Sequence, residues 1–268
     1  MPTAASPAPA PAAAPAATPL GDVKAWFRRL CISDNGLVYE DENLQVGVKS
    51  SFSAGQGRLD IFFGNKTAGA LSGVAVHVAP EPGLELTIGP VPTELPPGQQ
   101  VSVTIQAALN LPFAEAPGLT IAYLAPSGAG RVTVQTKAPL ALCKFLTPTV
   151  ITNPPEFFGR WQALAGPPQK IQEVVTLSPA VAGAGLEGLK RLCTSLRLGL
   201  CPSLDPSATN LVAASALTAV GGASLPVLLR IETDPANAAQ VRLTVASANA
   251  TATSAVKAQF VQQLTQSS

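Results

Sequence analysis

Runs of alternating apolar and polar residues fill the first half of the chain. A period of two is typical of a strand with one buried face, and the Gly, Pro and Asn between the runs favour turns. The runs predict strands at residues 44–49, 59–63, 74–78, 84–88, 101–105, 119–123, 131–135 and 140–145. Short strands at this regular spacing indicate an antiparallel, immunoglobulin-like β-sandwich.

The pattern changes after Pro148. It predicts helices over an aromatic segment at 156–164 and over 169–177, 186–193 and 254–264, with strands at 196–200, 211–217, 227–232 and 241–246. This half is expected to be an antiparallel sheet with helices against one face. The fold class of the whole chain is therefore α+β.

The opening segment is rich in Ala and Pro and cannot bury enough apolar surface to fold, so we expect an extended linker. The patterns divide the chain into a flexible linker over 1–21, a sandwich over 22–146 and an α/β subdomain over 147–268. A length of 268 residues suits two folded domains.

Three large aromatic side chains, Phe157, Phe158 and Trp161, fall within five positions of a chain whose aromatic content is only 5%. Upstream, Asn153 is a candidate helix cap, and Glu156 stands three residues later, where its carboxylate can bond back. At helical spacing the three rings can border one surface patch. The patch is either a binding site or a stripe of core packing.

Strand alternation places one aromatic side chain on a polar face. In residues 58–63, Phe62 points away from Leu59, Ile61 and Phe63. The same rule turns three further residues outward: Gly47, Lys49 and Gln100. An exposed Phe beside them suits a groove for an extended peptide. Alternatively, a loop covers Phe62 or a bulge turns it inward.

Alternation also brings charged side chains to one face of the second sheet. Arg230 and Glu232 share a face, and Arg242 lies on the same kind of face one strand later. Arg binds a carboxylate through paired hydrogen bonds, while Trp and Phe receive an aromatic ring. A short peptide with Asp near Phe or Trp satisfies both. Alternatively, Arg230 and Glu232 form a solvated surface pair.

Charge and cysteine content exclude several classes of function. Lys plus Arg is 17 against 16 for Asp plus Glu, without a basic tract for nucleic acid or an anionic membrane. The spacing of the four cysteines fits neither zinc nor a dense disulfide scaffold, which favours reduced, cytosolic thiols: Cys31, Cys143, Cys193 and Cys201. We find no signal peptide and no membrane-spanning apolar run.

An enzyme is not expected. His77 is the only histidine, and it lies in an alternating run without a nucleophile or carboxylate pattern nearby. No phosphate loop, zinc spacing or nucleophile elbow occurs. The sequence therefore predicts no catalytic residues, metal or cofactor.

Six short motifs follow one another across both halves. They are Leu-Gln-Val-Gly-Val-Lys-Ser (44–50), Phe-Phe-Gly-Asn-Lys-Thr (62–67), Phe-x-Glu-Ala-Pro (113–117), Lys-Phe-Leu-x-Pro-Thr (144–149), Phe-Phe-x-Arg-Trp (157–161) and Leu-Leu-Arg-Ile-Glu (228–232). With these motifs in this order, the chain from Trp26 onward resembles the appendage, or ear, of alpha-adaptin, a subunit of the plasma-membrane clathrin adaptor complex. Beta-adaptin and coatomer gamma appendages share the plan and are the nearest alternatives; a secreted sugar-binding sandwich is a more distant one.

The resemblance implies a non-catalytic module, a sandwich followed by a platform, carried on a hinge from the adaptor core at clathrin-coated pits. Its implied partners are disordered tails of endocytic accessory proteins. Asp-Pro-Phe, Asp-Pro-Trp and Phe-x-Asp-x-Phe motifs are expected at a platform site formed by Phe157, Phe158, Trp161, Arg230, Glu232 and Arg242. Trp-x-x-Phe motifs are expected at a sandwich site formed by Gly47, Lys49, Phe62 and Gln100. One departure is Ala246, where the family has a further arginine.

Overall fold

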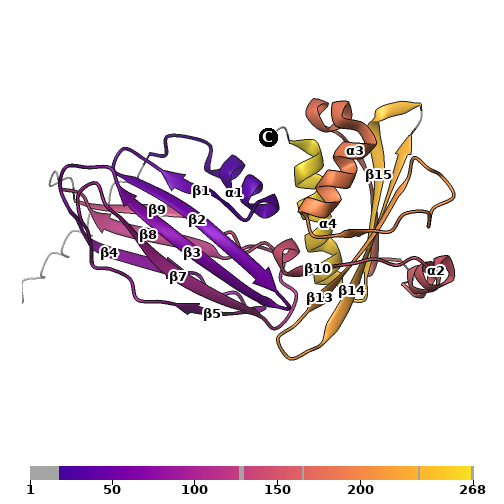
Figure 1. Ribbon diagram of the computed structural model, residues 1–268, viewed down its shortest axis with the longest axis horizontal. Helices are drawn as coiled ribbons and strands as arrows, with labels where there is room; N and C mark the ends of the chain where they lie inside the picture. Colours follow the sequence, from indigo (N-terminus) through magenta and orange to yellow (C-terminus); the bar gives the residue numbers. More distant parts are fainter. Residues whose placement is uncertain (1–17, 127–129, 165, 235, 267–268) are drawn as a thin grey trace, which may run out of the picture.

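Strand pairing in the first half builds two antiparallel sheets that face each other. The computed structural model describes residues 18–126, 130–164, 166–234 and 236–266, so most of the expected linker lies outside the described residues. The strands are β1 (Asn35–Glu40), β2 (Leu44–Ser53), β3 (Gln56–Asn65), β4 (Leu71–Val78), β5 (Leu84–Ile88), β6 (Glu94–Leu95), β7 (Gln100–Leu109), β8 (Gly118–Leu124) and β9 (Arg131–Lys137). One sheet has the order β1-β2-β3-β7-β5 and the other β6-β4-β8-β9, which confirms the predicted sandwich (Figure 1).

Alternation along β3 sets which side chains fill the sandwich core. Leu59, Ile61 and Phe63 are completely buried, whereas Phe62, between them, is half-buried on the outer face. The predicted inward and outward faces of this strand are confirmed.

The second half forms one sheet of six strands with helices on both faces. Its elements are the 3₁₀ helix η1 (Leu142–Phe145), β10 (Leu146–Thr149), α2 (Pro154–Ala163), β11 (Lys170–Thr176), α3 (Pro179–Ser195), β12 (Gly199–Leu200), β13 (Leu211–Thr218), β14 (Ser224–Asp234), β15 (Asn237–Ser247) and α4 (Ala250–Thr265). The main order is β10-β13-β14-β15-β11, and β12 pairs with β13. We call residues 23–137 the sandwich and residues 146–265 the platform.

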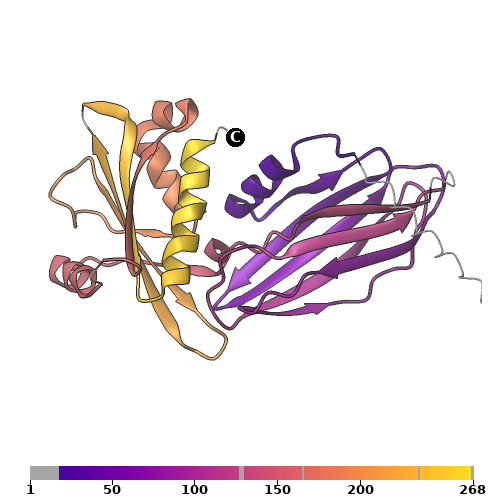
Figure 2. The same ribbon diagram turned by 180° about the vertical axis from the view of Figure 1, so that it is seen from behind.

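Helices α3 and α4 cover the sheet face turned toward the sandwich, and α2 lies on the opposite face (Figures 1 and 2). The expectation of helices on one face alone was therefore wrong. The reason is that β14 is apolar on both sides. Leu229 and Ile231 join the main core, while Leu228 packs in a second cluster with Phe157 of α2.

Several local predictions were also wrong. The segment predicted as a helix over 169–177 contains the strand β11 instead, because Ile171, Val174 and Val175 favour an extended chain and β11 pairs along β15. Residues 140–145 are not a strand but lead into η1, and within 196–200 only β12 is extended. The sequence patterns did not predict β1, β6, β10 or the helix α1 (Val23–Ile32). The start of α1 is capped by the Asp22 carboxylate, which accepts from two backbone N–H groups.

The other helical and strand predictions in the platform are confirmed in type, with most ends shifted by a few residues; α3 begins at Pro179, about two turns of helix before the predicted start at 186. The four cysteines are free and buried. Among the described helices, none combines the length and apolar character needed to cross a membrane.

A buried lysine joins the two subdomains. Lys144 of η1 is 2% exposed, and its ammonium donates to Asp34 at 2.8 Å and to the carbonyl of Ser33 at 2.7 Å. Arg197 of the platform reaches the same carboxylate at 3.2 Å. Burial lowers the pKa of Lys144, opposed by its bond to Asp34. Asp34 therefore balances charge at the connection between sandwich and platform.

We predict that Asp34→Ala destabilises the protein more than Lys144→Met. The first change leaves a buried ammonium without its counter-charge and is expected to cost about 2 kcal/mol of unfolding free energy. The second removes the buried charge, while the half-exposed Asp34 stays hydrated. Urea unfolding curves compare the two variants, with Glu115→Ala, which breaks an exposed pair with Lys137, as a control near zero. An equal or larger loss for Lys144→Met contradicts this account.

Candidate functional site

The aromatic segment forms the helix α2, as predicted. Asn153 is at the N-cap, with Pro154 and Pro155 in the first turn, but its side chain makes no capping bond. Glu156 does not bond back to the cap either; its carboxylate accepts from Arg160 at 2.7 Å, one turn along the helix. The start of this helix therefore depends on the two prolines, whose fixed φ suits a first turn.

The three aromatic side chains of α2 divide between core and surface. Phe157 is completely buried, whereas Phe158 and Trp161 are half-buried. The Phe157 ring is stacked on Trp161 with centroids 5.7 Å apart and meets Phe158 edge to face at 5.4 Å. The expectation that all three border one surface patch was wrong for Phe157, because that side chain packs on the sheet. It supports the two rings that reach solvent.

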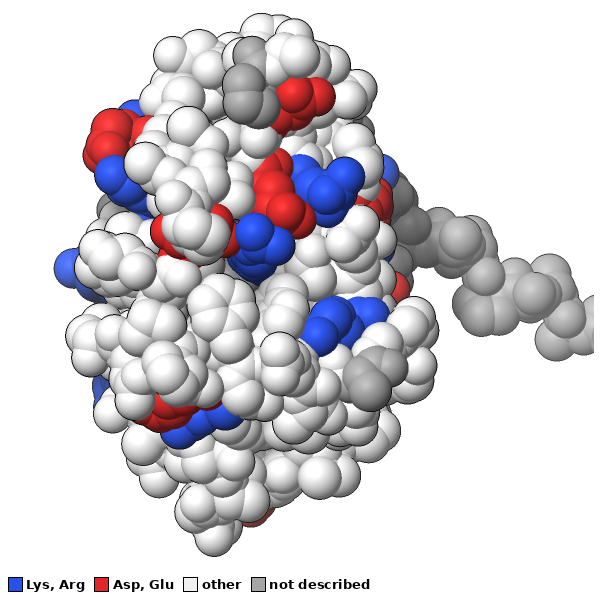
Figure 3. Space-filling view, turned by 90° about the vertical axis from the view of Figure 1, so that its right-hand side faces the viewer, with Lys and Arg blue, Asp and Glu red and all other residues white. Residues whose placement is uncertain are grey.

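A row of charged side chains lies on the same sheet face. Glu232 of β14 stands opposite Arg242 of β15, with their charged atoms 3.8 Å apart. Glu232 also pairs with Arg230 at 3.1 Å. Seen from the α2 side, basic and acidic side chains gather at the centre of this face (Figure 3). The three charged residues predicted for the platform are thus together.

Arg230 has a further partner that the sequence did not predict. Its Nε donates to the carboxylate of Asp205 at 2.7 Å, and the Asp205 side chain is only 4% exposed. Burial raises the pKa of Asp205, but bonds from Arg230, Ser207 and Asn210 outweigh that effect and lower it. The Asp-Pro dipeptide at 205–206 signals a turn in the sequence, but nothing in it indicates an ion pair with β14.

The loop before β13 connects the aromatic and charged parts of this face. Leu204 is 3% exposed and packs in the cluster that contains Phe157, Leu228 and Ala246. Its neighbour Asp205 holds Arg230. The loop therefore holds the Arg230 side chain in a set position next to the hydrophobic cluster beneath α2. We call the sheet face that carries α2, this loop and the charged row from Arg230 to Arg242 the α2 face.

The sandwich residues predicted as a second site line one hollow. Its volume is about 400 Å³, and Gly47, Lys49, Phe62 and Gln100 all contribute to its wall. Phe62 faces Gly47 across the β2–β3 pair, and the Lys49 ammonium lies 5.8 Å from the Phe62 ring centroid. No bulge interrupts the β2–β3 pairing at Phe62. Because Gly47 has no side chain, no side chain covers the Phe62 ring from the opposite position on β2.

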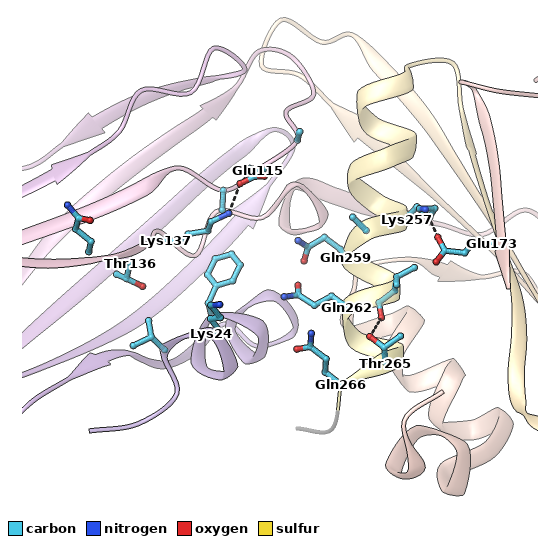
Figure 4. Close-up of a pocket in the computed structure, with 17 residues that line it drawn as sticks. Lys24, Glu115, Thr136, Lys137, Glu173, Lys257, Gln259, Gln262, Thr265 and Gln266 are labelled. Carbon is cyan, nitrogen blue, oxygen red and sulfur yellow. Dashed lines mark hydrogen bonds and ion pairs between the residues drawn. The ribbon is translucent and has the colours of Figure 1, made fainter. Parts of the chain in front are cut away.

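A different groove, of about 970 Å³, lies between sandwich and platform. Side chains of α1, β9 and α4 line it (Figure 4). Two of its lysines are already paired, Lys137 with Glu115 and Lys257 with Glu173. The predicted site residues do not line this groove. In the described part of the chain, no group of three or more His, Cys, Asp or Glu residues is placed to hold a metal.

Comparison with protein families gives two matches that together span both subdomains. Residues 144–264 match the model described as "Alpha adaptin AP2, C-terminal domain". Residues 34–138 match the one described as "Adaptin C-terminal domain".

Individual relatives agree with these matches. The chain is 36% identical over 245 residues to the AP-2 complex subunits alpha-1 and alpha-2 of Arabidopsis thaliana, covering 91% of this chain and 24% of each relative. It is 31% identical to the AP-2 complex subunit alpha-2 of Dictyostelium discoideum, covering 90% of this chain and 24% of the relative. The chain thus spans about a quarter of the length of these proteins.

Among solved structures, the GAE domain of GGA2p from Saccharomyces cerevisiae overlaps 40% of this chain and 97% of that domain. The TM-score is 0.35 and the identity is 17%. With this TM-score and this share of the chain, the similarity carries no conclusion about the fold. The family matches favour the alpha-type appendage over the beta-adaptin and coatomer gamma alternatives.

We predict that Phe157→Ala and Phe158→Ala differ in cost although they remove the same atoms. Phe157→Ala empties a fully buried site and is expected to lower the unfolding free energy by about 3–5 kcal/mol. Phe158→Ala is expected to cost clearly less, since that ring already meets water. Parallel urea unfolding curves measure both. Equal losses contradict the division of α2 into a buried support and an exposed surface.

Proposed function

The chain belongs to the alpha-adaptin family, to whose C-terminal appendage region it corresponds, and on that premise we propose that it binds short linear peptide motifs at two separate surfaces. The platform surface takes Asp-Pro-Phe, Asp-Pro-Trp and Phe-x-Asp-x-Phe motifs, and the sandwich surface takes Trp-x-x-Phe motifs. The partners are disordered tails of endocytic accessory proteins. The chain acts without catalysis, as a recruiting module.

One observation carries the proposal. Four sandwich residues selected from the sequence, which come from three different strands and include the half-buried ring of Phe62, line a single hollow. An aromatic motif residue can pack against Phe62 there, with Lys49 and Gln100 available for its polar flank. The α2 face supports the second surface, since it places the half-exposed Phe158 and Trp161 near a charged row.

We extend the proposal to a cellular role, for which the family membership is the support. As part of a clathrin adaptor of the AP-2 type, the appendage works in the cytoplasm at plasma-membrane coated pits during clathrin-mediated endocytosis, joined to the rest of the adaptor through its hinge. A motif of three to five residues buries little surface, so each contact is expected to bind at about the micromolar level. Two surfaces on one tethered module then add avidity. The chain gathers partners through many weak contacts.

We predict that Trp161→Ala removes binding of Asp-Pro-Phe and Asp-Pro-Trp peptides, raising their dissociation constants about thirtyfold or more. Trp-x-x-Phe binding is expected to stay unchanged, which also controls for folding. Fluorescence anisotropy with labelled peptides measures both. Unchanged affinity for the Asp-Pro peptides refutes the platform assignment.

The converse is expected for Phe62→Ala. Truncating the ring removes the apolar wall of the sandwich hollow, so Trp-x-x-Phe affinity falls about tenfold or more, while Asp-Pro-Trp affinity is retained. The same anisotropy titrations test this, with Arg58→Ala, an exposed outward residue on the same strand, as the control. Equal losses for both peptide classes contradict two independent surfaces.

A further inference from the structure

A lysine outside the predicted site lies against its central aromatic residue. Lys170 is the first residue of β11, and its ammonium stands 4.8 Å from the centroid of the Trp161 ring. The same ammonium donates a hydrogen bond to the Trp161 carbonyl at the end of α2. These two contacts fix a positive charge beside the half-exposed indole.

Strand register explains why Lys170 reaches this position. Lys170 is paired with Ala246 of β15, and Ala246 is paired in turn with Leu228 of β14. Residues directly opposite in an antiparallel pair share a face, and Leu228 and Ala246 both pack in the cluster beneath α2. Lys170 therefore lies on the α2 face of the sheet, in line with Ala246 and Leu228. Ala246 carries only a methyl group, so at this pair of opposed residues the long, charged side chain comes from Lys170.

The arginines of the α2 face are already engaged by carboxylates. Arg230 is held by the buried Asp205 at 2.7 Å and by Glu232 at 3.1 Å. Arg242 is 3.8 Å from Glu232. An incoming acid at Arg230 must compete with two acids that the fold supplies. The pairs of Arg230 with Asp205 and Glu232 have an entropic advantage over a pair with a peptide carboxylate, because a peptide loses translational and rotational freedom when it binds.

Lys170 differs in this respect. Among the described residues no carboxylate bonds to it, and its one hydrogen bond goes to a neutral carbonyl. An ammonium has three donors, so two remain for a ligand. Burial also lowers the pKa of Lys170, and a carboxylate ligand repays that cost by pairing with the partly desolvated charge.

We propose that Lys170, and not Arg230, binds the acidic side chain of acidic–aromatic peptide motifs on the platform, next to the ring bound at Phe158 and Trp161. In Asp-Pro-Phe the acid and the ring are two residues apart, about 7 Å along an extended chain. A cation beside the aromatic surface is within that reach. This inference rests on the proposed peptide-binding function of the platform.

The test compares Asp-Pro-Trp with Asn-Pro-Trp peptides, which differ only in the charge of one side chain. Wild-type protein is expected to prefer the acid about tenfold. In the neutral variants Lys170→Gln and Lys170→Met this preference is expected to fall below about threefold, while Asn-Pro-Trp affinity changes little. Lys170→Arg is expected to keep the preference. Arg160→Gln, which removes a cation from α2 itself, serves as the matched control and is expected to leave the preference intact.

The possible results distinguish a failure of the role proposed for Lys170 from a failure of the peptide-binding function proposed for the platform. Wild-type protein that binds neither peptide refutes the platform function, and with it the role of Lys170. Wild-type protein that binds both, with a preference for acid that survives in Lys170→Gln and Lys170→Met, overturns the role of Lys170 alone. A preference that falls equally in Arg160→Gln also overturns it, since the effect is then that of general surface charge. Trp-x-x-Phe binding at the sandwich verifies that each variant is folded.

Discussion

The pairing of β14 with β15 is the constraint on which the platform depends. In this register alternate residues of β14 enter two different hydrophobic clusters, Leu229 and Ile231 toward α3 and α4, and Leu228 toward α2. A shift of one residue exchanges the two faces. It would bury Arg230 and Glu232 in the main core and turn Leu229 and Ile231 out of it, onto the face that now carries the charged row. The charged row is therefore fixed by the same packing that holds the sheet together.

The same logic operates at the connection between the subdomains. Lys144, Asp34 and Arg197 come from the 3₁₀ helix, the start of the sandwich and the platform, and they meet at one carboxylate. Gln263 of α4 also donates to the backbone carbonyl of Arg28 in α1, a residue pair far apart in sequence. These contacts hold two candidate peptide surfaces on one body. Each is formed by a different sheet, so a change in one need not reach the other.

Local patterns predicted the central strands of the sandwich well because strands such as β2 and β3 alternate between a buried and a more exposed face. The alternation that buried Leu59, Ile61 and Phe63 also left Phe62 outside, and the hollow around it followed from that rule. The platform strand β11 was harder to predict. Its Lys170, Gln172 and Glu173 suit an exposed helix, and only pairing with β15 makes them a strand.

Contacts between distant segments were beyond prediction from sequence. The Asp205 carboxylate meets Arg230 across 25 positions, and Lys170 of the strand β11 meets Trp161 of the helix α2. The burial of Phe157 likewise depends on the sheet face that α2 covers. For these reasons the residues of the candidate site could be selected from the sequence. Which of them is buried beneath the surface, which is exposed and which is already in an ion pair could not.

The central claim is that Trp161 forms part of a peptide-binding surface on the platform. The chain contains two tryptophans, Trp26 and Trp161, so the indole N–H region of an NMR spectrum of ¹⁵N-labelled protein holds one reporter on α1 and one on α2. We would titrate with an Asp-Pro-Phe peptide, which adds no indole of its own. The account predicts a saturable shift of the Trp161 resonance and a stationary Trp26 resonance. A Trp161 resonance that stays in place while the peptide binds would contradict it.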